Sequence, residues 1–215
     1  MRIFVALLGI VIGTVGLGID ASIMFPSELT VTPARPVARS FPDALIYFWT
    51  FFTHLTNLGL LLIYVAEISG WRWVAWLRTG QARAVAGGYI MLVMVYYHFM
   101  LAPTLTLEGP IGFATVLLHY VTPLLYLFWW ALLTPHGQLR FRQVPALLIP
   151  GLLYVAWALL RGAITGEYPY DILDAGKFGY QQVAIGTGVL VAAVAVFCLV
   201  LVFVDKLVAR TRIGQ

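Results

Sequence analysis

Six long apolar stretches limit what this chain can fold into. They cover residues 3–25, 44–66, 84–103, 111–133, 145–160 and 181–204. A transmembrane helix needs about 20 mostly apolar residues, because the hydrocarbon core of a bilayer is about 30 Å thick. Uninterrupted apolar runs of this length predict helices, since a helix satisfies its own backbone in lipid. We therefore expect an all-α, polytopic membrane protein, with residues 1–215 forming a single bundle of six transmembrane helices.

The composition agrees with this class and excludes others. Hydrophobic residues make up 61% of the chain and charged residues only 10%, whereas soluble domains average about 45–50% and about 25%. A soluble domain and a disordered tail are therefore excluded. The net charge of +4 does not indicate a nucleic-acid partner, because basic residues in such a chain act as topology signals. Cys198 stands alone in an apolar run, which predicts a buried structural thiol.

The distribution of Lys and Arg predicts the orientation of the helices. Four basic residues fall on one side of the predicted membrane, namely Arg35, Arg39, Arg161 and Lys177. Nine fall on the other side, namely Arg2, Arg72, Arg78, Arg83, Arg140, Arg142, Lys206, Arg210 and Arg212. Short cytoplasmic loops carry the excess of Lys and Arg, so we expect both termini in the cytoplasm.

Polar side chains interrupt three of the apolar runs in their outer halves. Thr50, Thr53, His54 and Asn57 have the i, i+3, i+4, i+7 spacing of one helix face. His119 lies with Thr115 and Thr122 at similar spacing in the fourth run, and His98 closes the third. At 1.5 Å per residue, Thr50 lies ~9 Å and His119 ~12 Å from the outer surface. These groups are predicted to share one pocket. The loop that contains Tyr168, Tyr170 and Asp174 is either a lid over this pocket or part of an interfacial aromatic belt.

This set of groups predicts a nucleophile and a base. A threonine hydroxyl becomes a useful nucleophile when a histidine takes its proton, so Thr50 (or Thr53) and His119 are the catalytic candidates. Thr53, His54 and Asn57 are candidates for supporting roles or for donating to an oxyanion. The apolar runs that carry these groups hold no buried carboxylate for such a pair, and Asp171 or Asp174 of the lid would have to supply one. Acyl transfer or hydrolysis of a lipid ester fits, with no cofactor or metal required.

Two other classes of function remain open at this stage. Polar stripes also hold helices together, so a non-catalytic lipid-binding or scaffold protein explains the same residues. His54, His98 and His119 could alternatively be axial ligands of a haem in an electron-transfer protein, or the three ligands of a zinc ion.

Four ordered motifs resemble a known family. They are Phe48-Trp49-Thr50-Phe51-Phe52-Thr53-His54-Leu55-Thr56-Asn57, Leu117-Leu118-His119-Tyr120-Val121-Thr122-Pro123-Leu124-Leu125-Tyr126, the loop with Pro135, Gly137 and Leu139, and Tyr168-Pro169-Tyr170 followed by Leu173-Asp174. Together they resemble the bacterial six-helix "Pr6Pr" membrane proteins, over about residues 47–174.

That bacterial family is similar to the eukaryotic androgen-induced protein family, which is described as intramembrane threonine hydrolases of fatty acid esters of hydroxy fatty acids. The resemblance implies that Thr50, in its Phe-x-Thr-Phe context, is the nucleophile, and that His119, which precedes Pro123, is the essential histidine. It also implies a multi-pass protein of a bacterial plasma membrane, with membrane lipids and a fatty-acyl ester as its partners. The oligomeric state does not follow from the sequence.

Overall fold

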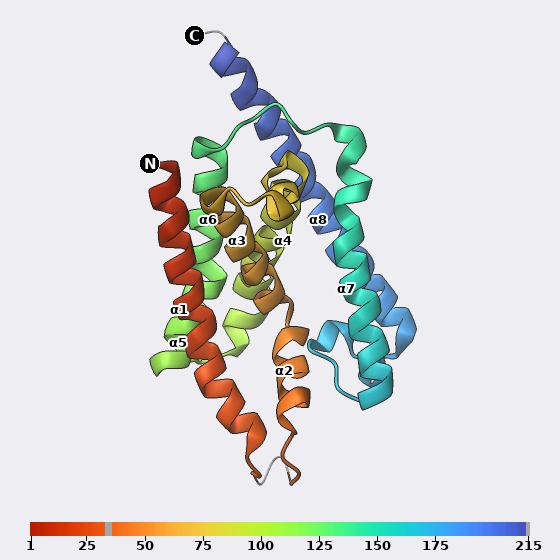
Figure 1. Cartoon of the computed structure of the whole chain (residues 1–215). Coiled ribbons are helices and arrows are strands. Elements are labelled where there is room, and N and C mark those ends of the chain that lie inside the picture. The colour runs from red at the N-terminus through yellow and green to blue at the C-terminus, as the bar shows by residue number, and fades with distance from the viewer. Residues whose placement is uncertain (33–35, 214–215) are drawn as a thin grey trace.

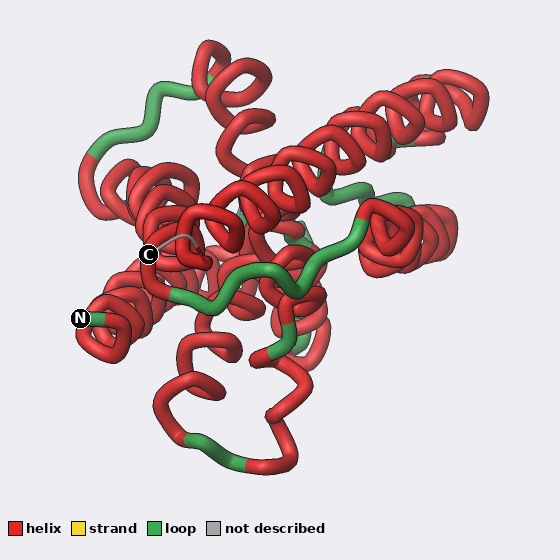
Figure 2. Tube along the Cα trace, turned by 90° about the horizontal axis from the view of Figure 1, so that it is seen from above, coloured by secondary structure: helices red, strands yellow, loops and turns green. Residues whose placement is uncertain are grey.

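The computed structural model describes residues 1–32 and 36–213, so Arg35 lies outside the described residues. Within these ranges the chain folds into helices and connecting loops, with no strand (Figures 1 and 2). Six helical stretches are long and apolar enough to cross a membrane. The prediction of six such helices is therefore confirmed. The stretches are Arg2–Leu29, Phe52–Ser69, Gly80–Thr104, Gly109–Leu133, Phe141–Thr165 and Ala175–Thr211.

Several of these stretches contain more than one helix. The α-helices are α1 (Arg2–Leu29), α2 (Phe41–Thr50), α3 (Phe52–Ser69), α4 (Gly80–Tyr96), α5 (Gly109–Val116), α6 (Thr122–Leu133), α7 (Val144–Thr165) and α8 (Ala175–Ile213). The short 3-10 or π-helical segments are η1 (Arg72–Arg78), η2 (Tyr97–Leu101), η3 (Ala102–Thr104), η4 (Leu117–Val121), η5 (Phe141–Gln143) and η6 (Asp171–Leu173).

The second predicted span is broken, which corrects the expectation of one helix over residues 44–66. Phe51 adopts an extended conformation (φ −72°, ψ 126°) between α2 and α3. The main-chain groups freed by this break need partners, because an unsatisfied polar group is costly in lipid. Two tyrosines supply them: the hydroxyl of Tyr154 donates to the carbonyl of Thr50, and the N–H of Phe52 donates to the hydroxyl of Tyr170.

Small residues let α1 approach the centre of the bundle. A Cβ atom on Gly9 would lie 2.3 Å from the ring of Tyr64, and one on Gly13 would lie 2.8 Å from Leu61, both on α3. Glycine is therefore required for this close contact, as in other membrane helix pairs. Tyr64 in turn packs edge-on against the buried Trp129 of α6.

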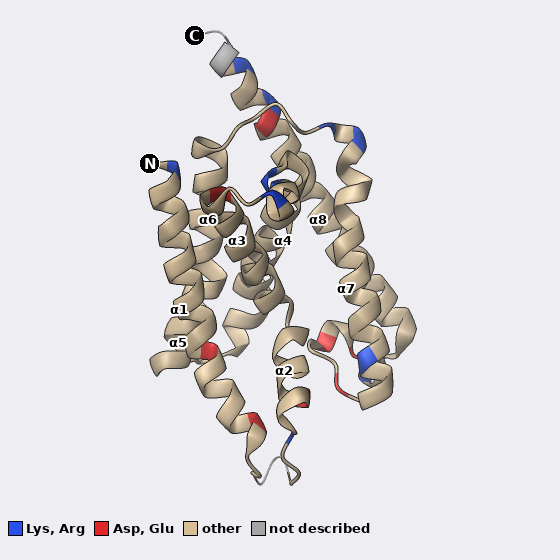
Figure 3. Cartoon of the chain, viewed as in Figure 1, with Lys and Arg blue, Asp and Glu red and all other residues tan. Residues whose placement is uncertain are grey.

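Both termini lie at the same end of the bundle (Figure 1). Lys and Arg concentrate at that end, whereas most Asp and Glu lie at the opposite end (Figure 3). The two acids at the terminal end are buried and paired. Glu67 forms ion pairs with Arg2 and Arg83, and Asp205 accepts hydrogen bonds from the main chain of the loop before α7.

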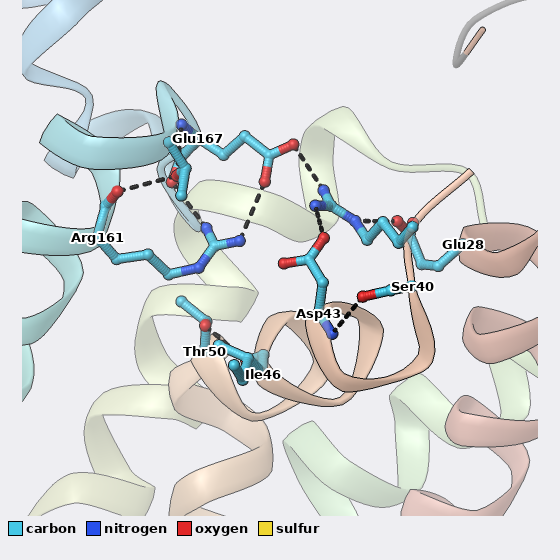
Figure 4. Close-up of polar contacts among 9 residues, drawn as sticks. Glu28, Ser40, Asp43, Ile46, Thr50, Arg161 and Glu167 are labelled. Carbon is cyan, nitrogen blue, oxygen red and sulfur yellow. Dashed lines mark hydrogen bonds and ion pairs between the residues drawn. The ribbon is translucent and has the colours of Figure 1, made fainter. Parts of the chain in front are cut away.

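At the opposite end, called the outer end below, Arg39 connects three separate segments, whose acids Glu28, Asp43 and Glu167 are labelled in Figure 4. Its guanidinium contacts Glu28 of α1 at 2.7 Å, Asp43 of α2 at 2.9 Å and Glu167 at 2.6 Å. Arg161 of α7 holds the other carboxylate oxygen of Glu167 at 3.0 Å. Glu167 begins the run that leads to Tyr170, so this network anchors the outer loop, residues 166–174, to α1, α2 and α7.

The network predicts a pH-dependent contribution to stability. Partial burial would raise the pKa of the Glu167 carboxyl, but hydrogen bonds from Arg39 and Arg161 outweigh it and lower the pKa below 4.5, the ordinary value. The pKa is thus lower in the folded protein than in the unfolded chain. The ionised carboxylate therefore stabilises the fold at neutral pH, and this contribution is lost as the pH falls below about 4.5.

We expect Glu167→Gln to lower the melting temperature of the detergent-solubilised protein at pH 7, with a difference from wild type that shrinks towards pH 4. The control is Glu108→Gln, which changes an exposed carboxyl at the same end. Thermal unfolding followed by circular dichroism between pH 4 and pH 8 measures both. An equal difference across this range would contradict the assigned ion pairs.

Candidate functional site

The break at Phe51 places a threonine beside a histidine from another helix. Thr53 lies in the first turn of α3, and its hydroxyl oxygen is 3.3 Å from Nε2 of His119. His119 lies in η4, a π-helical turn between α5 and α6. Single π-helical turns are frequent at functional sites, because they reorient side chains within a helix.

The main chain defines which nitrogen of His119 carries the proton. Nδ1 lies 3.0 Å from the carbonyl oxygen of Thr115, which can only accept, so Nδ1 is the donor. In the neutral ring, Nε2 is then free to accept the proton of the Thr53 hydroxyl. The ring of Tyr97 covers the imidazole at a centroid distance of 4.1 Å. The arrangement is that of a hydroxyl nucleophile and its general base.

Tyr170 brings a third polar group to the same place. Its hydroxyl accepts the N–H of Phe52 at 3.0 Å, and it is also hydrogen-bonded to Thr53. Burial raises the pKa of the Tyr170 phenol, and the hydrogen bonds from Thr53 and Phe52 only partly oppose this. The phenol is therefore protonated at neutral pH and has a proton to donate.

These side chains line an apolar cavity with a volume of about 80 Å³. Thr53, His119 and Tyr170 form part of its wall. The remainder comes mostly from apolar residues of α4, α7 and α8, including Val93, Leu148, Leu152, Val155, Val191 and Val194. Leu152 is also 47% exposed on the outside of the bundle. The cavity lining therefore includes a residue that is also exposed at the surface of the bundle.

Thr50 does not pair with His119, contrary to the expectation from helical spacing. Its side chain is fully buried, and its hydroxyl donates to the carbonyl of Ile46 at 2.7 Å (Figure 4). The reason is the break at Phe51: Thr50 ends α2 and Thr53 lies in the first turn of α3, so the two residues no longer share one helix face.

A carboxylate lies within the bundle after all, and it comes from α1. Asp20 contacts Nε2 of His54 at 2.6 Å, while Nδ1 of His54 lies 2.6 Å from the carbonyl oxygen of Phe48. Both nitrogens of this buried imidazole are therefore engaged. Asp20 is not among the site residues expected from the sequence. Its position inside the first apolar run, residues 3–25, was the available signal.

Asn57 connects three helices beneath the site. Its amide nitrogen donates to the carbonyls of Thr53 and Leu118, and its amide oxygen accepts the hydroxyl proton of Thr122 at 2.5 Å. With both amide hydrogens occupied, Asn57 positions the helices that carry Thr53 and His119, and it has no hydrogen left for an oxyanion.

The other predicted site residues lie away from the cavity. His98 is exposed and contacts the hydroxyl of Tyr120 at 3.1 Å. Tyr168 packs against Gly162 of α7, where any Cβ atom would overlap its ring. Asp174 accepts the N–H of Lys177 in the first turn of α8, and Asp171 pairs with the Lys177 ammonium. The outer loop thus places Tyr170, but neither of these acids, at the candidate pair.

The three histidines are not arranged as a shared ligand set. Among residues 1–32 and 36–213, no group of three His, Cys, Asp or Glu side chains is placed to hold a metal ion. The nearest partners of His54, His98 and His119 are instead the polar groups described above.

Comparisons with known proteins add no relative: no family model, curated protein or solved structure matches this chain.

The role of Asn57 can be tested through stability. We expect Asn57→Ala to lower the free energy of unfolding by about 1–3 kcal/mol, because it removes the two hydrogen bonds that the amide nitrogen donates and the one that the amide oxygen accepts from Thr122. Thr56→Ala is the matched control, since the Thr56 hydroxyl bonds only carbonyls of its own helix. Denaturant unfolding in mixed micelles compares the two variants. Equal stability would show that Asn57 does not connect the helices.

Proposed function

We propose that this protein is an intramembrane hydrolase of lipid esters, in which Thr53 is the nucleophile and His119 the general base. The single observation that supports this most is the contact between the Thr53 hydroxyl and Nε2 of His119 at the wall of an apolar cavity. The separation of 3.3 Å is slightly longer than an ideal hydrogen bond, as is common in sites without substrate. The proposal keeps the chemistry that the family resemblance implies and assigns the nucleophile to Thr53 in place of Thr50.

The reaction follows from the two groups. Thr53 Oγ1 attacks the ester carbonyl carbon while its proton passes to Nε2 of His119, which gives a tetrahedral intermediate. The bond to the alcohol then breaks, and His119 returns the proton to the departing alkoxide oxygen. Water, deprotonated by the same nitrogen, cleaves the acyl-threonine and restores the free hydroxyl. Nδ1 keeps its hydrogen bond to the Thr115 carbonyl throughout. This hydrogen bond stabilises the imidazolium that forms when Nε2 takes the proton.

The cavity indicates the kind of substrate. Its volume of about 80 Å³ is below the roughly 300–1,000 Å³ of a typical ligand pocket. It therefore accommodates the ester and the nearest part of an acyl chain, and the rest of the chain extends past Leu152 into the bilayer. Fatty acid esters of hydroxy fatty acids, or similar acyl esters, have this shape.

The assay is hydrolysis of p-nitrophenyl decanoate and of a fatty acid ester of a hydroxy fatty acid by the protein in lipid vesicles. We expect Thr53→Ala and His119→Ala each to lower kcat/KM by about 10³-fold or more, since each removes one of two groups that act as a unit. Thr50→Ala retains activity. If Thr50→Ala alone is inactive, the nucleophile is Thr50. If wild type binds these esters without cleaving them, the protein is a lipid-binding protein and the proposal is wrong.

The proposal includes an orientation in a bacterial plasma membrane, with both termini in the cytoplasm and the site in the outer leaflet. It is supported by the excess of Lys and Arg at the terminal end (Figure 3). Because the only cysteine, Cys198, is buried, single introduced cysteines report their side of the membrane. We expect an impermeant maleimide to label Glu108→Cys in intact cells, and Thr211→Cys only after lysis. The reverse pattern would invert the orientation.

A further inference from the structure

The first turn of α3 needs hydrogen-bond acceptors at the point where the proposed reaction occurs. The first four N–H groups of a helix have no acceptor within it. In this helix the N–H groups of His54 and Leu55 reach the carbonyl of Phe51. The N–H of Phe52 has only the hydroxyl of Tyr170, from a loop 118 residues further along the chain.

Tyr170 is held at this position from both ends of its loop. Before it, Glu167 is bound by Arg39 and Arg161. After it, Leu173 is buried in a cluster with Ala158 of α7 and Val183 of α8. The Tyr170 ring also contacts the edges of Phe51 and Tyr96. The hydroxyl is therefore placed by packing and ion pairs, without the help of a ligand.

The direction of the hydrogen bonds leaves the phenol with a proton for the cavity. The main-chain N–H of Phe52 donates to the Tyr170 oxygen, so this contact does not use the phenol hydrogen, and Tyr170 lines the same cavity wall as Thr53. A hydroxyl that accepts one hydrogen bond becomes a stronger donor in the next. When Thr53 Oγ1 attacks the carbonyl carbon of an ester, the carbonyl oxygen lies close to Oγ1. It therefore also lies close to the phenol hydrogen of Tyr170.

From this geometry we propose that Tyr170 donates a hydrogen bond to the carbonyl oxygen of the substrate and stabilises the negative charge that develops there. The inference rests on the proposed hydrolase function. In the tetrahedral intermediate the carbonyl π electrons have moved onto oxygen, and the Tyr170 O–H bond remains intact. The ester carbonyl oxygen accepts the phenol hydrogen while the Thr53 hydroxyl faces His119.

The test compares Tyr170→Phe with wild type on p-nitrophenyl decanoate in vesicles. Removal of one oxyanion donor lowers kcat by about 10²- to 10³-fold. We expect this loss in kcat with little change in KM, because the hydrogen bond strengthens only as charge develops. Tyr180→Phe is the matched control, since it removes a phenol hydroxyl from an exposed residue at the same end and is expected to leave kcat unchanged. Melting temperatures establish that the variants are folded.

A second readout separates the two proposals. An alkyl fluorophosphonate reacts with an activated hydroxyl by displacement of fluoride, and mass spectrometry of the labelled peptide identifies the residue. Wild type should be labelled at Thr53. The Tyr170→Phe variant should be labelled more slowly, and its labelling rate should fall by about the same factor as its kcat. If wild type is neither active nor labelled, the hydrolase proposal itself fails. If wild type is active and labelled while Tyr170→Phe matches it in kcat and labelling, only the role of Tyr170 is wrong.

A third variant applies if Tyr170→Phe does not fold. Incorporation of 3,5-difluorotyrosine at position 170 keeps the hydroxyl and the ring but lowers the pKa of the phenol. If Tyr170 is the donor, the alkaline limb of the kcat profile moves to lower pH, because the ionised phenol has no hydrogen to donate. An unmoved alkaline limb would contradict the proposal.

Discussion

A main-chain N–H group in lipid has to find an acceptor, and this requirement shapes the outer half of the bundle. The interruption at Phe51 frees the N–H of Phe52 and the carbonyl of Thr50, and side chains from two distant parts of the chain bind them. Non-helical backbone is tolerated at membrane depth only where protein or a cavity surrounds it. The break at Phe51 therefore depends on the two tyrosines that bind the main-chain groups it frees.

The same requirement explains why polar groups collect in one place. Asn57 and Thr122 bind each other and the carbonyls of α3 and η4, so the helices that carry Thr53 and His119 are held in register by buried hydrogen bonds. Tertiary ion pairs around Arg39 then hold the outer loop over this region. Hydrogen-bonded packing of this kind is what places a hydroxyl within reach of an imidazole, in a fold whose other contacts are mostly apolar.

Local sequence indicated two of the residues that form the candidate pair. The polar residues of the second and fourth runs were expected at one level, and the structure brings Thr53 of one and His119 of the other together. The pairing of Thr50 with His119 was wrong, because periodicity assumes a continuous helix. Asp20 was not among the candidates although it lies within the first apolar run, because only the tertiary structure brings this part of α1 beside His54.

The sequence by itself determined that six apolar helices form, because each run is long enough to span a bilayer and only a helix satisfies its own backbone there. It also determined which residue types are available for chemistry. Only the tertiary structure decided which of two threonines faces the histidine, and that a tyrosine of the outer loop joins them. Those contacts depend on a single extended residue, Phe51, whose conformation is stabilised by hydrogen bonds from Tyr154 and to Tyr170, more than 100 positions further along the chain. No local pattern contains that information.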